Sequence, residues 1–315
     1  MLTDGSELGA WARALPEADY IILPVGAIEA LTGCFFGLLA MPEFLPGLGD
    51  SKMEQTHPAD LSRFVPFPMI RREVPDAEEL DVTIPRCPVR RAFGWHLTSV
   101  SLSFLLLHEM GHVLAGHLDS LVEGPSGWKE LSASGRFASG VIPRRVIELD
   151  ADTFAAFHGS LFDLSENRRS LIARTFPCEH LPPHLMPFIA HGISMSALFR
   201  LLTDEPVTVP STPGFDEYPP PDVRSHLSMS RILAYAVEAR VFDESDAPFV
   251  LRHAIQGVER AWDLRQMRGV RLGPPRDWRE TIGDMTIRLF QEYRAFTPLL
   301  AKQSRLDPFW HQGHW

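Results

Sequence analysis

Two histidines and a glutamate lie close together in the chain, at a spacing that can bind a metal ion. They are His108, Glu109 and His112, within the sequence HEMGH. On a helix that advances about 100° per residue, the two histidines lie about 40° apart on one face. Two imidazoles placed in this way can bind one tetrahedral Zn²⁺ ion. Glu109 lies about 100° from His108 and about 60° from His112, so its carboxylate can reach a water molecule at the ion and act as a general base.

A set of carboxylates lies further along the chain, in the sequence ELDADTFAA. Glu148 and Asp152 are four residues apart and therefore share one face of a helix. Glu148 can supply a third ligand, and Asp152 can accept the far N–H of a liganding histidine and fix its tautomer. Asp150 lies about 200° from Glu148 and is predicted to point elsewhere. Residues 113–147 are long enough to turn the chain and bring the two helices together.

Apolar residues surround both polar sets. The run SFLLL precedes His108, and residues such as Val146, Leu149 and Phe154 flank the carboxylates. Two ordinary alternatives remain open, namely two satisfied core histidines in a buried helix and a solvated acidic helix face. Burying imidazoles and carboxylates is costly unless something compensates their polar groups. A metal ion would compensate both sets, which favours the metal site.

A further histidine on the same helix is not predicted to bind the ion. The pattern HExxHxxGxxH would need glycine at position 115 and histidine at position 118, where this chain has Ala115 and Leu118. His117 lies about 180° from His108 on a continued helix. We therefore expect His117 to cap the helix or to lie in a loop.

These residues resemble the gluzincin metallopeptidases, and most closely the CaaX-prenyl-protease/HtpX-like group. That group carries HExxH followed on a later helix by ExxxD, here His108–His112 and Glu148–Asp152. The resemblance implies that His108, His112 and Glu148 bind one zinc ion per chain and that Glu109 is the general base. It also implies that Asp152 hydrogen-bonds one of the ligands. The part of the chain that carries it is about residues 95–160.

A weaker similarity lies in the sequence YPPPDVR. It resembles the THPP…R segment found downstream in such enzymes, with Tyr218 where histidine would stand. The similarity implies that Arg224 is near the site, and that Tyr218, Arg224 or His226 stabilises the transition state. The alternative is a proline-rich loop that leads into an ordinary helix.

Two other groups of HExxH proteins share these features. The ImmA/IrrE-like peptidases have a similar pair of helices, and the Lit-type phage-exclusion peptidases have about this size. The HtpX-like enzymes, by contrast, cross the membrane several times, and this chain has one apolar stretch of sufficient length, residues 20–41. Pro24, Glu29 and acidic flanks favour a buried strand and helix there over a membrane span.

The hydrophobic periodicity along the rest of the chain predicts a mostly α (α+β) fold with a small β-component. Together with the resemblance, this implies a zincin-like metallopeptidase core with an active-site helix and helical additions. We expect an N-terminal α/β part over residues 1–94, the catalytic core over 95–204 and a helical part over 205–315, packed as one continuous domain. The expected helices are 4–14, 95–117, 143–164, 186–202, 222–241, 246–268 and 277–303, and the expected strands are 20–23, 64–70 and 80–84.

Composition restricts the class of protein further. The chain has 315 residues, is 45% hydrophobic and carries a net charge of −10. These values exclude wholesale disorder and argue against nucleic-acid binding. Three isolated cysteines exclude a disulfide framework and fit a reducing compartment, so we expect a cytoplasmic protein.

The predicted function is zinc-dependent hydrolysis of peptide bonds in a peptide or protein substrate. One alternative is a regulatory or binding protein with a structural or vestigial zincin site. Another is a membrane-anchored quality-control protease, held through residues 20–41. No pattern in the sequence selects a particular substrate or an oligomeric state.

Overall fold

The computed structural model describes residues 2–3, 10–14, 17–54, 84–120, 129–130, 142–202, 221–266 and 278–305. Most of these residues are helical. The helices are α1 (Val25–Leu39), α3 (Pro88–Leu114), α4 (Arg144–Asp163), α5 (Glu166–Thr175), α6 (Met186–Leu201), α7 (Pro221–Glu238), α8 (Ala247–Leu251), the π-helix η7 (Arg252–Gln256), α9 (Gly257–Gln266) and α10 (Trp278–Gln303). Short 3₁₀ turns include η4 (His117–Ser120).

A small sheet completes the fold. Its strands are β1 (Leu2–Thr3), β2 (Trp11–Ala14), β3 (Asp19–Pro24) and β4 (Lys129–Glu130), in the order β1-β3-β2-β4. β3 is parallel to β1 and antiparallel to β2, and β2 is antiparallel to β4. The predicted mostly helical class with a small β-component is therefore confirmed.

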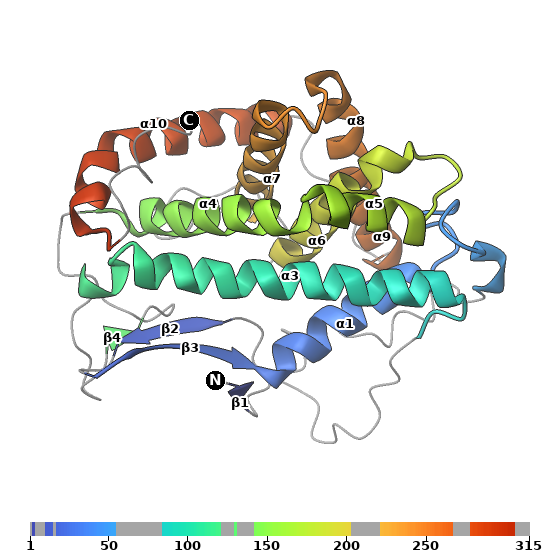
Figure 1. Ribbon diagram of the computed structural model, residues 1–315, viewed down its shortest axis with the longest axis horizontal. Helices are drawn as coiled ribbons and strands as arrows, with labels where there is room; N and C mark the ends of the chain where they lie inside the picture. The colour runs from blue at the N-terminus through green and yellow to red at the C-terminus, as the bar shows by residue number, and fades with distance from the viewer. Residues whose placement is uncertain are drawn as a thin grey trace.

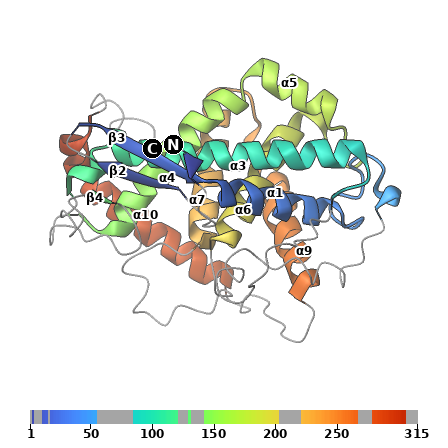
Figure 2. The same ribbon diagram turned by 90° about the horizontal axis from the view of Figure 1, so that it is seen from below.

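The long helix α3 runs through the middle of the molecule (Figure 1). It lies between α4 on one side and the sheet and α1 on the other, and the strands gather at one end of it (Figure 2). The main apolar core joins α1, α3 and α6 with neighbouring helices. A second apolar cluster joins α4, α7 and α10 through residues such as Val146, Leu149, Leu227 and Leu289. The helix α4 thus contributes to both clusters, whereas α3 packs in the main core.

The apolar stretch at residues 20–41 forms β3 followed by α1, the strand and helix that its prolines and charge indicate. Among the described residues, α3 is the helix long and apolar enough to cross a membrane by length and composition. Its most apolar window is 56% buried inside the protein. The core helix of a soluble protein has the same properties, so this helix is weak evidence for a membrane protein.

Several expected elements differ from the structure. The helix expected over residues 4–14 is wrong where the chain is described, because Trp11–Ala14 is strand β2, paired along its length with β3. Pairing with a neighbouring strand outweighs the helix propensity of this short segment. Residues 64–70 and 80–83 lie outside the described residues, and Ile84 is not in a strand.

The central helix begins earlier than expected. α3 starts at Pro88, a residue type that suits a first helical turn, so a boundary at residue 95 falls inside α3. The helix α5 (Glu166–Thr175) was not predicted. The segment expected as one helix over 246–268 is divided into α8, the π-helix η7 and α9.

A buried arginine fixes the start of α3 against the end of α1. Arg90 is fully buried, and its guanidinium donates to five backbone carbonyls at 2.6–3.2 Å. The acceptors are Leu39, Met41, Phe44, Leu45 and Leu48. The carboxylate of Glu54 lies 3.8 Å from Nε and also accepts the backbone N–H of Cys87. One side chain therefore holds the whole loop that follows α1.

Replacing this side chain should strongly destabilise the fold. Arg90→Ala removes the guanidinium donor from five backbone carbonyls and the positive charge beside the buried Glu54 carboxylate, and we expect the free energy of unfolding to fall by about 3–5 kcal/mol. Urea denaturation followed by circular dichroism measures the change. The matched control is Arg91→Ala at the exposed neighbouring position, with an expected change within about 0.5 kcal/mol. Equal stability of the two variants would contradict this role.

Candidate metal centre

A glycine allows α3 and α4 to pack unusually close together. A β-carbon at Gly111 would lie 3.1 Å from Cα of Ala151 and 3.1 Å from Cβ of Phe154. About one turn earlier in α3, Leu107 approaches a later part of α4, because a β-carbon at Gly159 would lie 3.6 Å from Cδ1 of Leu107. The two helices therefore run in opposite directions. The two helices run side by side (Figure 1), and this close approach brings the polar residues of α3 and α4 together.

Three side chains converge where the helices meet. The Nε2 atoms of His108 and His112 are 3.0 Å apart, and Nε2 of His108 lies 3.5 Å from Oε2 of Glu148. One donor atom from each residue lies within 4.8 Å of the other two. The three residues are 6%, 1% and 4% exposed, respectively. This buried group can hold a metal ion.

The donor set fits zinc in both chemistry and spacing. Two imidazole nitrogens and a carboxylate oxygen are common zinc ligands. With bonds of about 2.0–2.1 Å in a tetrahedral site, two donors should be about 3.3 Å apart. The observed separations of 3.0 and 3.5 Å lie on either side of this value. Without a cation, the two imidazoles face each other at hydrogen-bonding distance in a buried site.

The far side of His108 is fixed by Asp152, as the four-residue spacing predicts. Nδ1 of His108 lies 2.8 Å from Oδ1 of Asp152, so Nδ1 carries the proton and Nε2 is directed at the metal site. Burial alone lowers the pKa of His108, but hydrogen bonds to Asp152 and Glu148 outweigh it and raise this pKa to about 10. His108 therefore carries a second proton at neutral pH, and a metal ion bound at Nε2 would replace it.

Arg224 on α7 holds both carboxylates. Its Nε and Nη2 donate to the two oxygens of Asp152 at 2.7 and 2.8 Å, and Nη2 lies 3.5 Å from Oε2 of Glu148. The guanidinium also stacks over the ring of Phe199, 4.9 Å from its centroid. Burial would raise the pKa of Asp152, but the charge and hydrogen bonds of Arg224 lower it to about 2. The expected proximity of Arg224 to the site therefore agrees with its contacts.

The other two residues of the downstream segment differ from Arg224. His226 is two residues further along α7, about 200° around the helix, so it faces away from the side that carries Arg224. Tyr218 lies outside the described residues. The contacts of Arg224 are with carboxylates of the site, which makes it a positioning group for Asp152 and Glu148.

Glu109 is a buried carboxylate beside these residues. Its Oε2 has no hydrogen-bond partner among the described residues, and its carboxylate accepts the backbone N–H of Ala12 on β2. Burial raises the pKa of Glu109 to about 8, although the charge of His108 opposes the increase. A metal cation in the site would lower this pKa and leave an ionised carboxylate at neutral pH.

A chain of polar contacts that sequence patterns did not indicate lies behind His112. Nδ1 of His112 is 2.9 Å from Nδ1 of His117, and Nε2 of His117 is 3.1 Å from Oδ2 of Asp150. The hydroxyl of Tyr293 on α10 donates to Oδ1 of Asp150 at 2.6 Å. His117 lies in η4, just past the end of α3, and is not among the three converging residues. Asp150 points away from Glu148 as expected, but it contacts His117, which in turn contacts His112.

The helix end explains why His117 approaches His112. α3 ends at Leu114, and Gly116 adopts a left-handed backbone with φ of 74°, which favours glycine. The chain turns there, so the angle of about 180° expected for a continued helix no longer applies. The Gly-His dipeptide after HExxH is the one sequence signal for this turn. No sequence pattern singled out Tyr293.

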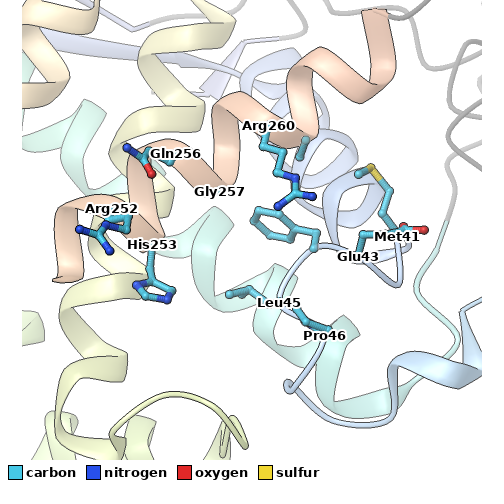
Figure 3. A pocket seen from close by; sticks show the side chains of 11 residues that line it. Met41, Glu43, Leu45, Pro46, Arg252, His253, Gln256, Gly257 and Arg260 are labelled. Carbon is cyan, nitrogen blue, oxygen red and sulfur yellow. The ribbon is translucent and has the colours of Figure 1, made fainter. Parts of the chain in front are cut away.

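A pocket of about 270 Å³ lies apart from this cluster (Figure 3). It opens between the loop that follows α1 and the segment formed by η7 and α9. Its lining includes Met41, Phe44, Leu45, His253, Gln256 and Arg260. None of the converging residues lines it, so the metal centre and this pocket are separate features.

Comparison of the chain with protein-family models, with curated proteins and with solved structures gave no match.

Metal binding should release protons and become tighter as pH rises. Because the pKa of His108 is about 10 in the metal-free site, an incoming cation displaces a proton at any pH below this value. The affinity for Zn²⁺ or Co²⁺ should therefore rise about tenfold per pH unit for each proton released, between about pH 6 and 8. Competition with a chelator of known affinity measures this slope. An affinity that did not change with pH would contradict the assigned protonation.

Gly111→Ala should weaken metal binding. Alanine improves the helix propensity by about 1 kcal/mol, but its methyl group meets the backbone of Ala151 and forces the helices apart. We expect the metal affinity to fall by about tenfold. The control is Gly159→Ala, where the new methyl group makes an ordinary contact and the affinity should not change. Equal affinities of both variants would show that the close approach at Gly111 is not needed.

Proposed function

We propose that this protein is a zinc-dependent peptidase of the gluzincin type. The observation that carries the proposal is the convergence of His108, His112 and Glu148 within 4.8 Å, in a buried site next to a second carboxylate, Glu109. Three ligands and a separate base are what metal-assisted hydrolysis requires. The resemblance of the two helical patterns to gluzincins agrees with this arrangement.

The three converging residues would hold the ion through Nε2 of His108, Nε2 of His112 and Oε2 of Glu148. A zinc ion bound there would supply a Lewis acid that lowers the pKa of a water molecule and polarises the scissile carbonyl. Asp152 keeps the proton of His108 on Nδ1, and Arg224 keeps Asp152 ionised and in place. The protein thus holds the ligands in the required tautomer and orientation before the ion arrives.

Glu109 carries out the proton transfers. Its carboxylate takes a proton from the attacking water and later gives it to the amine that leaves. The N–H of Ala12 fixes the carboxylate, and Oε2 is the oxygen without a partner among the described residues. Its burial excludes competing water, and this strengthens the electrostatic interactions of the carboxylate.

β2 holds the base in place. β2 lies next to α3 (Figure 1), and the backbone N–H of Ala12 donates to the Glu109 carboxylate. Ala12 is fully buried, so β2 shields this side of the carboxylate from water. A peptide as the substrate is supported by the resemblance of the two helical patterns to gluzincins.

Glu109→Gln tests the chemistry. The amide cannot accept a proton, so we expect peptide hydrolysis to fall by at least about 10²-fold while one zinc per chain is retained. Glu148→Ala removes a ligand and should lose zinc as well as activity. Zinc is measured by elemental analysis after dialysis against a mild chelator, and hydrolysis by mass spectrometry of a peptide library.

The two variants separate the proposal from its alternative. A non-catalytic protein with a structural zinc would lose zinc in Glu148→Ala, but neither the wild-type protein nor Glu109→Gln would cleave any peptide. Wild-type activity in Glu109→Gln would exclude Glu109 as the base. A folded wild-type protein without zinc would end the peptidase proposal.

A further inference from the structure

The contacts behind His112 form one continuous buried chain. It runs from His112 through His117 and Asp150 to Tyr293, with separations of 2.9, 3.1 and 2.6 Å. The four residues are 1%, 0%, 1% and 0% exposed. They come from α3, the turn η4, α4 and α10, so the chain joins four elements at the metal centre.

When His112 binds a metal, the donors and acceptors in this series of contacts have only one possible arrangement. The lone pair of Nε2 is then used by the ion, so Nδ1 of His112 carries the proton and donates it. Nδ1 of His117 must accept this hydrogen bond, which places the proton of His117 on Nε2, next to Asp150. The carboxylate of Asp150 lies 3.1 Å from Nε2 of His117 and accepts the hydrogen bond of the Tyr293 hydroxyl. The negative charge of Asp150 therefore favours this tautomer of His117.

The two liganding histidines are therefore oriented in different ways. His108 is held directly by the carboxylate of Asp152, which is the arrangement the ExxxD spacing predicts. His112 is held by a neutral imidazole, and the carboxylate is one residue further away. The ring of His117 takes the place that a carboxylate or carbonyl usually has behind a metal-binding histidine.

Tyr293, the last residue in this series of contacts, links α10 to the end of α3. Tyr293 packs in the apolar cluster of α4, α7 and α10. Beyond α10, the backbone N–H of Arg305 donates to the carbonyl of Leu114 at 2.8 Å, and its guanidinium pairs with Asp19 and Asp119. The docked position of α10 and the end of α3 are thus held by the same contacts.

We propose that His117 is a positioning residue for the metal ligand His112, and that the chain His117–Asp150–Tyr293 couples metal binding to the docking of α10. This inference rests on the metal site of the proposed function but does not require that the site hydrolyse peptides. Because the coupling is reciprocal, a metal ion stabilises docked α10 as much as docked α10 strengthens metal binding. The C-terminal helix acts as part of the metal site without supplying a ligand.

The experiment measures metal affinity without turnover, in Glu109→Gln protein titrated with Zn²⁺ or Co²⁺. His117→Ala should lower the affinity by about 10–100-fold and change the visible absorption of the bound cobalt, because His112 loses its orientation. His117→Asn places an amide oxygen near the former position of Nδ1, so it should partly restore the metal affinity and the visible absorption of the bound cobalt. The control is His191→Ala, which removes an equally buried histidine on α6 and should change neither.

A second pair of variants tests the coupling to α10. Tyr293→Phe removes one oxygen atom and should lower the metal affinity about fivefold. In the protein with Tyr293, adding metal should slow amide hydrogen exchange in α10, and in Tyr293→Phe this protection should be lost. Tyr235→Phe, at a partly buried tyrosine on α7 outside these contacts, is the control, with unchanged affinity and unchanged protection.

The outcomes distinguish this inference from the proposed function. Affinity and cobalt spectra of His117→Ala that equal those of His191→Ala would overturn the positioning role, whatever the protein hydrolyses. If His117→Ala does not fold, the Tyr293→Phe variant tests the proposal instead. A metal affinity and a metal-induced protection of α10 equal to those of the protein with Tyr293 would then overturn it. A wild-type protein that binds zinc, shows the coupling and cleaves no peptide would end the peptidase proposal alone.

Discussion

The close approach of α3 and α4 at Gly111 is the constraint on which the rest of the structure depends. A β-carbon at Gly111 would meet the backbone of Ala151, and this close approach brings His108 and His112 on α3 within reach of Glu148 on α4. The two helices come together over apolar residues on both sides, so the imidazoles and carboxylates between them are removed from water. Close packing is favourable for the apolar neighbours and unfavourable for the buried charges, and the fold must satisfy both.

Compensation of these charges organises the surrounding elements. Arg224 supplies a positive charge from α7 to the two carboxylates on α4, and Tyr293 supplies a hydroxyl from α10 to the third, Asp150. Each of these helices packs on α4 through its own apolar residues, so packing and charge compensation act together. A buried ion pair of this kind is weak evidence for stability, but it restricts the arrangement of its partners. The restriction is useful in a site whose ligands must not move.

Much of the helical pattern and the convergence of three residues could be predicted because both follow from helical periodicity. Four-residue spacing puts His108 with His112 and Glu148 with Asp152, whatever the rest of the chain does. The role of His117 could not be obtained in this way, because Gly116 ends the helix and cancels the periodicity. Tyr293 is distant in sequence, and only tertiary packing brings it near Asp150. The strand at Trp11–Ala14 was missed because its conformation depends on its partner β3.

The site is assembled from segments near both ends of the described chain. Ala12 on β2 fixes Glu109, whereas Tyr293 and Arg305 act from α10 and the residues just beyond it. During synthesis, the residues of α3 and α4 leave the ribosome long before α10 exists, and N-terminal segments begin to fold first. A nascent chain therefore holds its histidines and carboxylates in an incomplete arrangement until translation has passed residue 305. A metal ion at this site would therefore be held in the complete arrangement only after the whole fold is in place.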